Sequence, residues 1–254
     1  MGRMPPAPES SAGAANPPAA ANDYDSFAEA YSAETEANLV NGYYARPAIL
    51  DLAGDVAGLR ILDAGCGSGP LSAALRDRGA IVTAIDSSTK MVALARQRLG
   101  ADADLLVADL RNPLAFPDGT FDDVVASLVL HYLEDWEAPL AELRRVLKPG
   151  GRLITAVDHP FATALMHREQ GRAPAYFETY NWTDSWTFGG HAALMSFWHR
   201  PLHAMTEAFT AAGFRISAIS EPPPASNTPR DLLPPEIGDN PAFLCFIFFV
   251  LQAD

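Results

Sequence analysis

The chain has 254 residues, of which 48% are hydrophobic and 19% are charged, and its formal net charge is −13. This length suits one large α/β domain or at most two small ones, and the composition is that of a globular protein rather than a disordered or membrane protein. The acidic charge argues against nucleic acid as a partner, because a nucleic-acid surface needs a basic footprint.

The sequence gives no sign of export or of a membrane partner. No apolar run approaches the ~18–20 residues of a membrane helix, and the start of the chain lacks a charged region followed by an apolar one. We therefore predict a cytoplasmic protein. Cys66 and Cys245 are far apart and lack metal-ligand spacing, so they indicate neither a disulfide framework nor a zinc site.

Residues 1–22 are rich in Ala, Pro, Ser and Gly and have no apolar periodicity, which predicts a disordered tail. The pattern becomes helical at Tyr24, and Tyr24 and Tyr31 lie on one face of the predicted helix. A second helix is predicted over residues 43–52, with Pro47 in its first turn, where proline is tolerated.

From residue 59 onward, apolar runs alternate with helix-like segments. Strands are predicted at 59–64, 80–85, 105–108, 121–128, 152–157, 214–220 and 242–251, and helices at 70–78, 88–99, 135–147 and 202–212. This alternation predicts an α/β domain over residues 23–254, with a parallel sheet that carries helices on both faces.

A glycine-rich turn, Asp63-Ala64-Gly65-Cys66-Gly67-Ser68-Gly69, follows the first of these strands. Glycines let the backbone turn tightly and approach a ligand, and the N-terminus of the next helix offers free N–H donors. The spacing is Gly-x-Gly-x-Gly, and Pro70 occupies the position where the dinucleotide fingerprint requires glycine. A nicotinamide or flavin cofactor is therefore disfavoured.

Two carboxylates follow the next two strands. Asp86 comes directly after the strand 80–85 and can accept hydrogen bonds from both ribose hydroxyls of an adenosine. Asp109 ends the following strand, where it can accept from the exocyclic amine of adenine. Because ligands of open α/β sheets bind at the carboxyl ends of the strands, the turn and both carboxylates predict one adenosine site. Capping of the next helix is the alternative role for Asp86.

These motifs, together with Ile85-Asp86-x-Ser88-x-x-Met91 and Leu147-Lys148-Pro149-Gly150-Gly151, resemble the class I S-adenosylmethionine-dependent methyltransferase family over residues 24–157. The resemblance implies a Rossmann-like, doubly wound sheet of seven strands in the order 3-2-1-4-5-7-6, with strand 7 antiparallel. It also implies S-adenosyl-L-methionine as cofactor and S-adenosyl-L-homocysteine as product. The expected reaction is in-line transfer of a methyl group to an O, N or C atom of a small-molecule acceptor.

The same resemblance assigns residues to the cofactor. Gly65, Gly67 and Gly69 would wrap its methionine part, and Asp86 would hold the ribose. The other residues expected to bind it are Tyr24, Tyr31, Arg46, Asp63, Ser87, Met91, Asp109, Leu110 and Ser127. Packing on the helix core is the alternative for the two tyrosines, and an ion pair at the surface is the alternative for Arg46.

Methyl transfer needs chiefly proximity, alignment and a dry pocket. A general base is required only where the acceptor must first lose a proton. His131 follows the fourth strand and His159 the fifth, so both are candidate catalytic bases; packing of the turn is the alternative for His131. His199 and His203 are four residues apart, but Pro201 prevents a continuous helical turn between them, so we predict no metal site.

Residues 158–200 interrupt the alternation and hold nine of the 24 aromatic residues, which is too many for a simple linker. By the resemblance, this insertion is a lid over the acceptor, and aromatic rings there would enclose a flat or apolar substrate. The predicted substrate-binding residues are Tyr176, Tyr180, Trp182 and Trp198. A satellite core or a dimer contact is the alternative.

The expected partner is a small-molecule acceptor, and the expected state is a monomer or homodimer. Two other functions stay open: an S-adenosylmethionine-binding enzyme of the same fold that catalyses a different reaction such as cyclisation, and a non-catalytic binding protein. The composition, rich in Ala, Pro and Arg, fits a GC-rich bacterial genome, for which a role in secondary metabolism would be typical.

Overall fold

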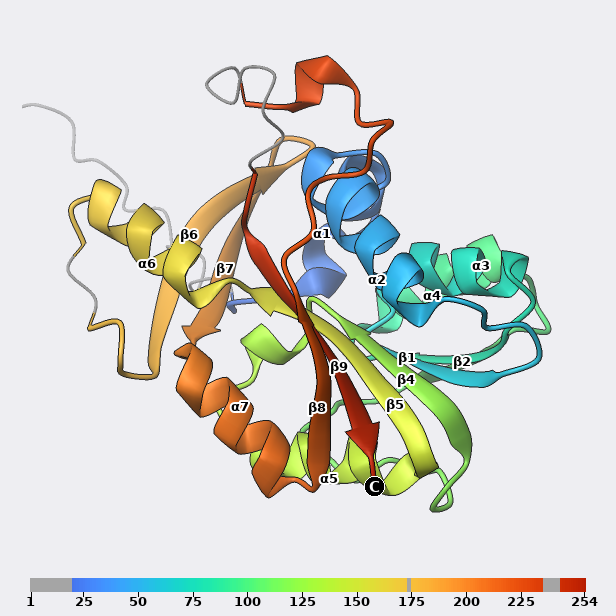
Figure 1. The fold of residues 1–254 in the computed structure, drawn as a ribbon. Coiled ribbons are helices and arrows are strands. Elements are labelled where there is room, and N and C mark those ends of the chain that lie inside the picture. Colours follow the sequence, from blue (N-terminus) through green and yellow to red (C-terminus); the bar gives the residue numbers. More distant parts are fainter. Residues whose placement is uncertain (1–19, 173–174, 235–242) are drawn as a thin grey trace, which may run out of the picture.

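The computed structural model describes residues 20–172, 175–234 and 243–254. Within these ranges the chain forms a seven-stranded sheet in the order β3-β2-β1-β4-β5-β9-β8 and a separate two-stranded hairpin, β6–β7 (Figure 1). Strands β1 to β5 pair in parallel, whereas β9 runs antiparallel to both β5 and β8. This is the predicted Rossmann-like order, with the two C-terminal strands numbered after the hairpin, so the fold class is confirmed.

The sheet strands are β1 (Arg60–Ala64), β2 (Ile81–Asp86), β3 (Asp104–Val107), β4 (Phe121–Ser127), β5 (Leu147–Asp158), β8 (Phe214–Ser220) and β9 (Phe246–Ala253). The α-helices are α1 (Tyr24–Thr35), α2 (Arg46–Ala53), α3 (Pro70–Asp77), α4 (Thr89–Leu99), α5 (Glu137–Val146), α6 (Pro160–Glu169) and α7 (Leu202–Ala211). A π-helical turn, η1 (Asn41–Ala45), precedes α2, and single 3₁₀ turns occur at η2 (Leu130–Tyr132) and η3 (Arg230–Leu232). Every strand and helix predicted between residues 59 and 157 is present.

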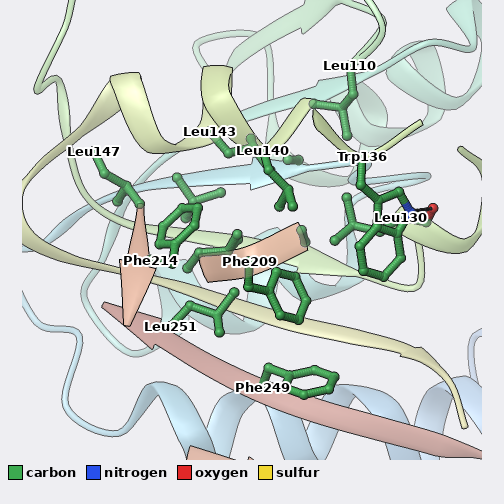
Figure 2. Close-up of a cluster of buried hydrophobic side chains, with 14 of the residues drawn as sticks. Leu110, Leu130, Trp136, Leu140, Leu143, Leu147, Phe209, Phe214, Phe249 and Leu251 are labelled. Atoms are coloured by element: carbon green, nitrogen blue, oxygen red, sulfur yellow. Dashed lines mark hydrogen bonds between the residues drawn. The ribbon is translucent and has the colours of Figure 1, made fainter. Parts of the chain in front are cut away.

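Both faces of the sheet are covered because neighbouring residues of a strand point to opposite sides. Leu62 packs on the side of α5 and α7, whereas Ile61 packs on the side of α2 and α3. Figure 2 shows the first of these cores, in which Phe209 of α7 lies near Phe249 of β9. The two cores hold the strands in place, so that their carboxyl ends form one rigid edge.

Helix α1 lies across that edge and is tied to it by hydrogen bonds. Asp25 of α1 accepts from Ser88 Oγ at 2.5 Å and from the backbone N–H of Lys90 at 3.0 Å, both at the start of α4. Ser32 Oγ donates to Ser68 Oγ in the glycine turn at 2.8 Å. These contacts place the aromatic side chains of α1 over the ends of β1 and β2.

The segment 158–200 contains helix α6 and the hairpin of β6 (Tyr180–Phe188) and β7 (His191–His199). Gly189 and Gly190 form its two-residue turn, with φ angles of 53° and 84°, as a type I′ turn requires. An inserted lid was predicted for this segment from the sequence, but the hairpin was not. A Gly-Gly pair between two alternating runs is a hairpin signal.

The start of the domain lies further toward the N-terminus than the sequence predicted. Asn22, assigned to the disordered tail, donates its backbone N–H to Leu194 O at 2.9 Å and exchanges two further hydrogen bonds with the Ser196 backbone. The boundary at residue 23 is therefore too late, because Asn22 is bound to β7. The predicted disorder of residues 1–19 lies outside the described residues.

Across the three described ranges, none of the helices is long and apolar enough to cross a membrane.

Candidate functional site

A cavity of about 340 Å³ lies at the carboxyl ends of β1, β2 and β4. Of the residues predicted to bind the cofactor, all except Gly69 line it: Tyr24, Tyr31, Arg46, Asp63, Gly65, Gly67, Asp86, Ser87, Met91, Asp109, Leu110 and Ser127. Residues from four strand ends and from α1 therefore meet in one place. Gly69 instead caps α3, and a Cβ atom there would lie 3.2 Å from Ala95 Cβ of α4.

The two glycines in the wall of this cavity occupy their positions for different physical reasons. Gly65 has a φ angle of +82°, and a Cβ atom there would lie 2.7 Å from Val129 Cγ2. A side chain at residue 65 is thus excluded by the neighbouring loop. Gly67 has a φ angle of +54°, yet beyond its chain neighbours no atom would lie within 4 Å of a Cβ atom added there. The backbone at Gly67 therefore borders open space that a ligand can enter closely.

Asp86 is the central carboxylate of the cavity. One of its oxygens accepts from the Gly67 N–H at 2.8 Å and the other from the Ser88 N–H at 2.9 Å. Each carboxylate oxygen can accept a further bond. Burial raises the pKa of Asp86 above its ordinary value. Because Ser88 is the N-cap residue of α4 and accepts from Met91 N–H, the capping alternative for Asp86 is wrong.

Asp63 lies deeper, at the end of β1. Its side chain is buried and accepts a hydrogen bond from Ser72 Oγ at 2.5 Å. Burial raises its pKa to about 7, and the nearby Asp86 carboxylate also raises it. Two buried carboxylates at one end of the cavity favour a ligand that brings positive charge or hydrogen-bond donors.

The opposite wall is formed after β3. Asp109 accepts from the Arg111 guanidinium, with Nη2 and Oδ2 2.5 Å apart, and this side chain lowers the pKa of Asp109. Met91 and Leu110 are buried beside it and give the cavity an apolar surface. A flat ring with an exposed amine fits between such a surface and such a carboxylate.

A second cavity, of about 600 Å³, adjoins the first. Both are lined by Tyr24, Tyr31, Thr35, Asn41, Leu128 and Tyr132. The hydroxyl oxygens of Tyr24 and Tyr132 lie 2.5 Å apart at this shared wall. Burial raises the pKa of Tyr24, Tyr31 and Tyr132, so all three are neutral phenols at neutral pH.

The second cavity is mainly aromatic. The hairpin contributes Trp182, Trp186, Phe188 and Phe197, and the Trp182 and Phe197 rings stack with centroids 4.7 Å apart. Of the four predicted substrate-binding residues, the structure brings only Trp182 to this cavity. The ring of Tyr180 stacks on His199, Tyr176 contacts His199, and Trp198 lies on the opposite face of β7 from Phe197. Alternation of strand side chains turns only Trp198 away from the cavity. Tyr180 shares the face of Trp182 but lies at the end of the hairpin away from its turn, and Tyr176 precedes the strand.

The two candidate bases lie in different surroundings. His131, in η2, is buried and lines the second cavity; its Nδ1 lies 3.3 Å from Asp158 Oδ1. His159 is the N-cap residue of α6: its Nδ1 accepts from Ala162 N–H, and its Nε2 lies 2.6 Å from Glu221 Oε1. Both nitrogens of His159 are engaged, and it lines neither cavity. Of the two histidines, only His131 therefore lies where it can reach a molecule bound in a cavity.

Three residues that line the second cavity were not predicted from the sequence. Leu128 has a φ angle of +57° directly after β4, which is uncommon for a bulky side chain and marks a strained turn. Nothing in the sequence signals that strain. Tyr132 follows His131 in a 3₁₀ turn, and Phe197 could have been found only through the unrecognised hairpin register.

The remaining histidines lie outside the two cavities. His199 Nε2 lies 2.9 Å from the Tyr176 carbonyl oxygen, and His203 is in the first turn of α7. Within the part of the chain that the structure describes, no three His, Cys, Asp or Glu side chains are grouped as a metal ion would require.

Comparison with known proteins matches residues 62–155 to the model of a methyltransferase domain family. Malonyl-[acyl-carrier protein] O-methyltransferase of Serratia marcescens is 44% identical over 97 residues, which are 38% of this chain and 37% of that protein. Demethylmenaquinone methyltransferase of Thermus thermophilus is 42% identical over 110 residues, 41% of this chain and 50% of that protein. The chain thus spans half or less of the length of these two curated relatives.

A similar solved structure covers more of the chain. The crystal structure of an S-adenosylmethionine dependent methyltransferase from Mesorhizobium loti aligns with a TM-score of 0.61 and 26% identity, over 81% of this chain and 96% of that one. The likeness therefore extends beyond the matched domain segment.

Proposed function

Since the chain carries a methyltransferase domain of the class I S-adenosylmethionine-dependent family, we propose that it transfers a methyl group from S-adenosyl-L-methionine to a small organic acceptor. The observation that carries this proposal is the shared wall of two cavities. A polar cavity lies at the glycine turn, an aromatic one lies under the hairpin, and both are lined by Leu128, Tyr24, Tyr31 and Tyr132.

The residues of the first cavity fit the cofactor. Gly67 borders open space on its ligand side, and Asp86 retains acceptor capacity for two ribose hydroxyls beyond its two backbone bonds. Asp63 would lie near the positively charged methionine part, and Met91 and Leu110 would flank the adenine. When bound, S-adenosyl-L-methionine supplies an electrophilic methyl group on a sulfonium.

The chain's own contribution is to position the cofactor and the acceptor and to exclude water. The phenols of Tyr24, Tyr31 and Tyr132 are neutral and partly buried, so they act as walls and hydrogen-bond partners rather than as bases at neutral pH. Helix α1 brings two of these rings to the shared wall and is tied to α4 through Asp25. A closed, aligned pair of sites supplies most of what methyl transfer requires.

The acceptor itself is a small molecule in the second cavity, whose volume of about 600 Å³ lies within the usual range for ligand pockets. The two relatives named above carry different acceptors in their names, so the names do not choose among acceptors. We also propose that the enzyme is cytoplasmic, which its two free thiols support. We propose further that it is a monomer or homodimer with a role in secondary metabolism.

Calorimetric titration with S-adenosyl-L-homocysteine tests the cofactor half of the proposal. Asp86→Ala should weaken binding by about ten- to a hundredfold, because it removes charge-assisted hydrogen bonds worth roughly 1.5–3 kcal/mol. Asp104→Ala is the matched control: Asp104 starts β3, accepts from Thr83 Oγ1 and does not line the cavity. Absence of binding at millimolar ligand by the folded protein, or equal loss in both variants, would contradict the proposal.

A further inference from the structure

His131 is held by the backbone of β5 as well as by a side chain. Strand β4 ends at Ser127, which is paired with Ala156, so on that side β5 is unpaired as it continues to Asp158, although β9 still pairs with it on the other side. There the backbone N–H of Asp158 donates to His131 Nδ1 at 3.2 Å, and Oδ1 of the same residue lies 3.3 Å from that nitrogen. Two different groups of Asp158 thus face one nitrogen of the ring.

This geometry determines where the imidazole proton lies. If Nδ1 accepts the Asp158 N–H, the neutral ring carries its proton on Nε2. If the ring is protonated, Nδ1–H faces the Asp158 carboxylate and Nε2 again carries a proton. Nδ1 cannot accept from the Asp158 backbone N–H in the protonated ring or in the neutral ring with its lone pair on Nε2, and a buried N–H without a partner is costly. The neutral ring with its proton on Nε2 is therefore favoured, and Nε2 is a donor in this state as it is in the protonated ring.

That donor has no partner in the part of the chain that the structure describes. His131 is 4% exposed and Nε2 is a buried nitrogen without a hydrogen bond. Trp182 Nε1 is another such nitrogen, and an indole N–H can only donate. Both residues line the second cavity and contact the Phe197 ring, at centroid distances of 5.4 Å and 4.7 Å.

Buried donors without partners imply a ligand atom that accepts. We propose that the second cavity takes an acceptor with a flat ring that bears an oxygen atom, and that His131 Nε2–H donates to this oxygen. The aromatic walls provide stacking surfaces for the ring. The nitrogen of an aryl amine is a weak hydrogen-bond acceptor because its lone pair is delocalised into the ring, so an aryl oxygen is preferred over an aryl amine. His131 then orients the acceptor oxygen rather than removing its proton. This inference rests on the proposed function for its description of the ligand as a methyl acceptor.

The tautomer can be measured without any acceptor. Long-range ¹H–¹⁵N spectra of the ¹⁵N-histidine-labelled protein would resolve both nitrogens of its six histidines, and His131→Gln would assign the signals of residue 131. We expect Nε2 of His131 to be protonated, and the same in Asp158→Asn, which keeps the backbone N–H. A neutral ring with its proton on Nδ1 would overturn the proposal.

Ligand preference is tested with three probes of one shape: naphthalene, 2-naphthol and 2-naphthylamine, titrated by calorimetry with and without S-adenosyl-L-homocysteine. We expect 2-naphthol to bind about tenfold more tightly than the other two. His131→Gln, which keeps a distal N–H but is no base, should retain most of the preference, and His131→Leu should lose it. Thermal melts establish that both variants fold.

The outcomes separate the two proposals. Equal binding of the three probes, tighter binding of the amine, no binding of any probe, or an unchanged preference in His131→Leu would each overturn the oxygen-bearing acceptor. Failure of S-adenosyl-L-homocysteine to bind while 2-naphthol is still preferred would instead overturn the cofactor assignment and leave the chemistry of the second cavity standing.

Discussion

The two cavities at the carboxyl edge of the sheet are built by different means. The first is formed largely by local backbone features. These are a glycine turn, the N–H groups of Gly67 and Ser88 that donate hydrogen bonds to Asp86, and short segments that directly follow β1, β2 and β3. The second is formed by side chains from α1, η2, α6 and the hairpin, which are far apart in the sequence. A backbone-built site depends on a few local positions, whereas a side chain-built site depends on how separate elements pack.

That difference predicts where substitutions act. Changes in the aromatic hairpin should alter stability and the acceptor side while sparing cofactor affinity. Changes in the glycine turn should instead weaken cofactor binding and affect the acceptor side less.

The largest expected effect is that of Phe197→Ala. Phe197 is buried and contacts the rings of His131, Tyr132, Trp182 and Trp186. Its removal should lower the free energy of unfolding by about 3–5 kcal/mol, measured by urea denaturation, with less than about a threefold change in S-adenosyl-L-homocysteine affinity.

Phe161→Ala is the control, since Phe161 of α6 is 62% exposed and should cost less than about 0.5 kcal/mol. If the two variants lose equal stability, the hairpin is not held by its aromatic cluster. If cofactor affinity collapses in Phe197→Ala, the two cavities are not built independently.

The next effect concerns Asp63 and pH. Its pKa is raised from 3.8 to about 7 by burial, so the folded state favours the protonated acid. The resulting stabilisation is complete below about pH 4 and is lost as the pH rises through about 7, by up to roughly 4 kcal/mol. The unfolding midpoint of the ligand-free protein should therefore fall over this window, as followed by thermal melts at several pH values.

Asp63→Asn should remove most of that fall, because an amide does not ionise. Some slope should persist, since burial also raises the pKa of Asp86. An unchanged pH profile in the variant would show that Asp63 is not the group responsible.

A smaller effect distinguishes two glycines with similar φ angles. Gly65 and Gly58 have φ angles of +82° and +77°, but of the two only Gly65 has a neighbour, Val129, within 4 Å of the added Cβ. Alanine at either position should cost about 1–2 kcal/mol of backbone strain. Gly65→Ala should cost about 1–3 kcal/mol more through overlap and should weaken cofactor binding. Equal losses of stability in urea would mean that the loop after β4 yields to the added methyl group.

The smallest effect is that of Tyr24→Phe at the shared wall. It removes one of the two hydroxyls that lie 2.5 Å apart and leaves that of Tyr132 without this partner. We expect a loss of about 1 kcal/mol in the free energy of unfolding. Tyr132→Phe should cost a similar amount, and the double variant should cost less than the sum. Additive losses in this double-mutant cycle would show that the two hydroxyls do not interact.

Much of the first cavity could be predicted from the sequence because its determinants are local. Glycines at residues 65 and 67 and the carboxylates of Asp86 and Asp109 each follow directly from a strand end. Once the strands pair in parallel, these positions converge without any further information. The strand order was predicted correctly through the resemblance to the methyltransferase family.

The acceptor side could be predicted only in outline. The many aromatic residues of segment 158–200 indicated that it is structured rather than a simple linker. The register of β6 and β7, however, decides which rings face inward. A shift of one residue would exchange Phe197 for Trp198. For this reason Trp198 does not reach the second cavity. Tyr180 shares the face of Trp182 but stacks on His199 at the end of the hairpin, outside the cavity. Similarly, His159 resembles a base in sequence but caps a helix in the structure.

By itself, the sequence determined the strands of the sheet, the glycine turn and the carboxylates that follow β2 and β3, since short-range spacing carries that information. Only the tertiary structure decided that Tyr24, Leu128 and Tyr132 join the two cavities, and that the backbone of Asp158 turns the free nitrogen of His131 into a donor. These features arise where β4 ends before β5 and where α1 and the hairpin pack together. Contacts between segments so distant in the chain leave no periodic pattern in the sequence.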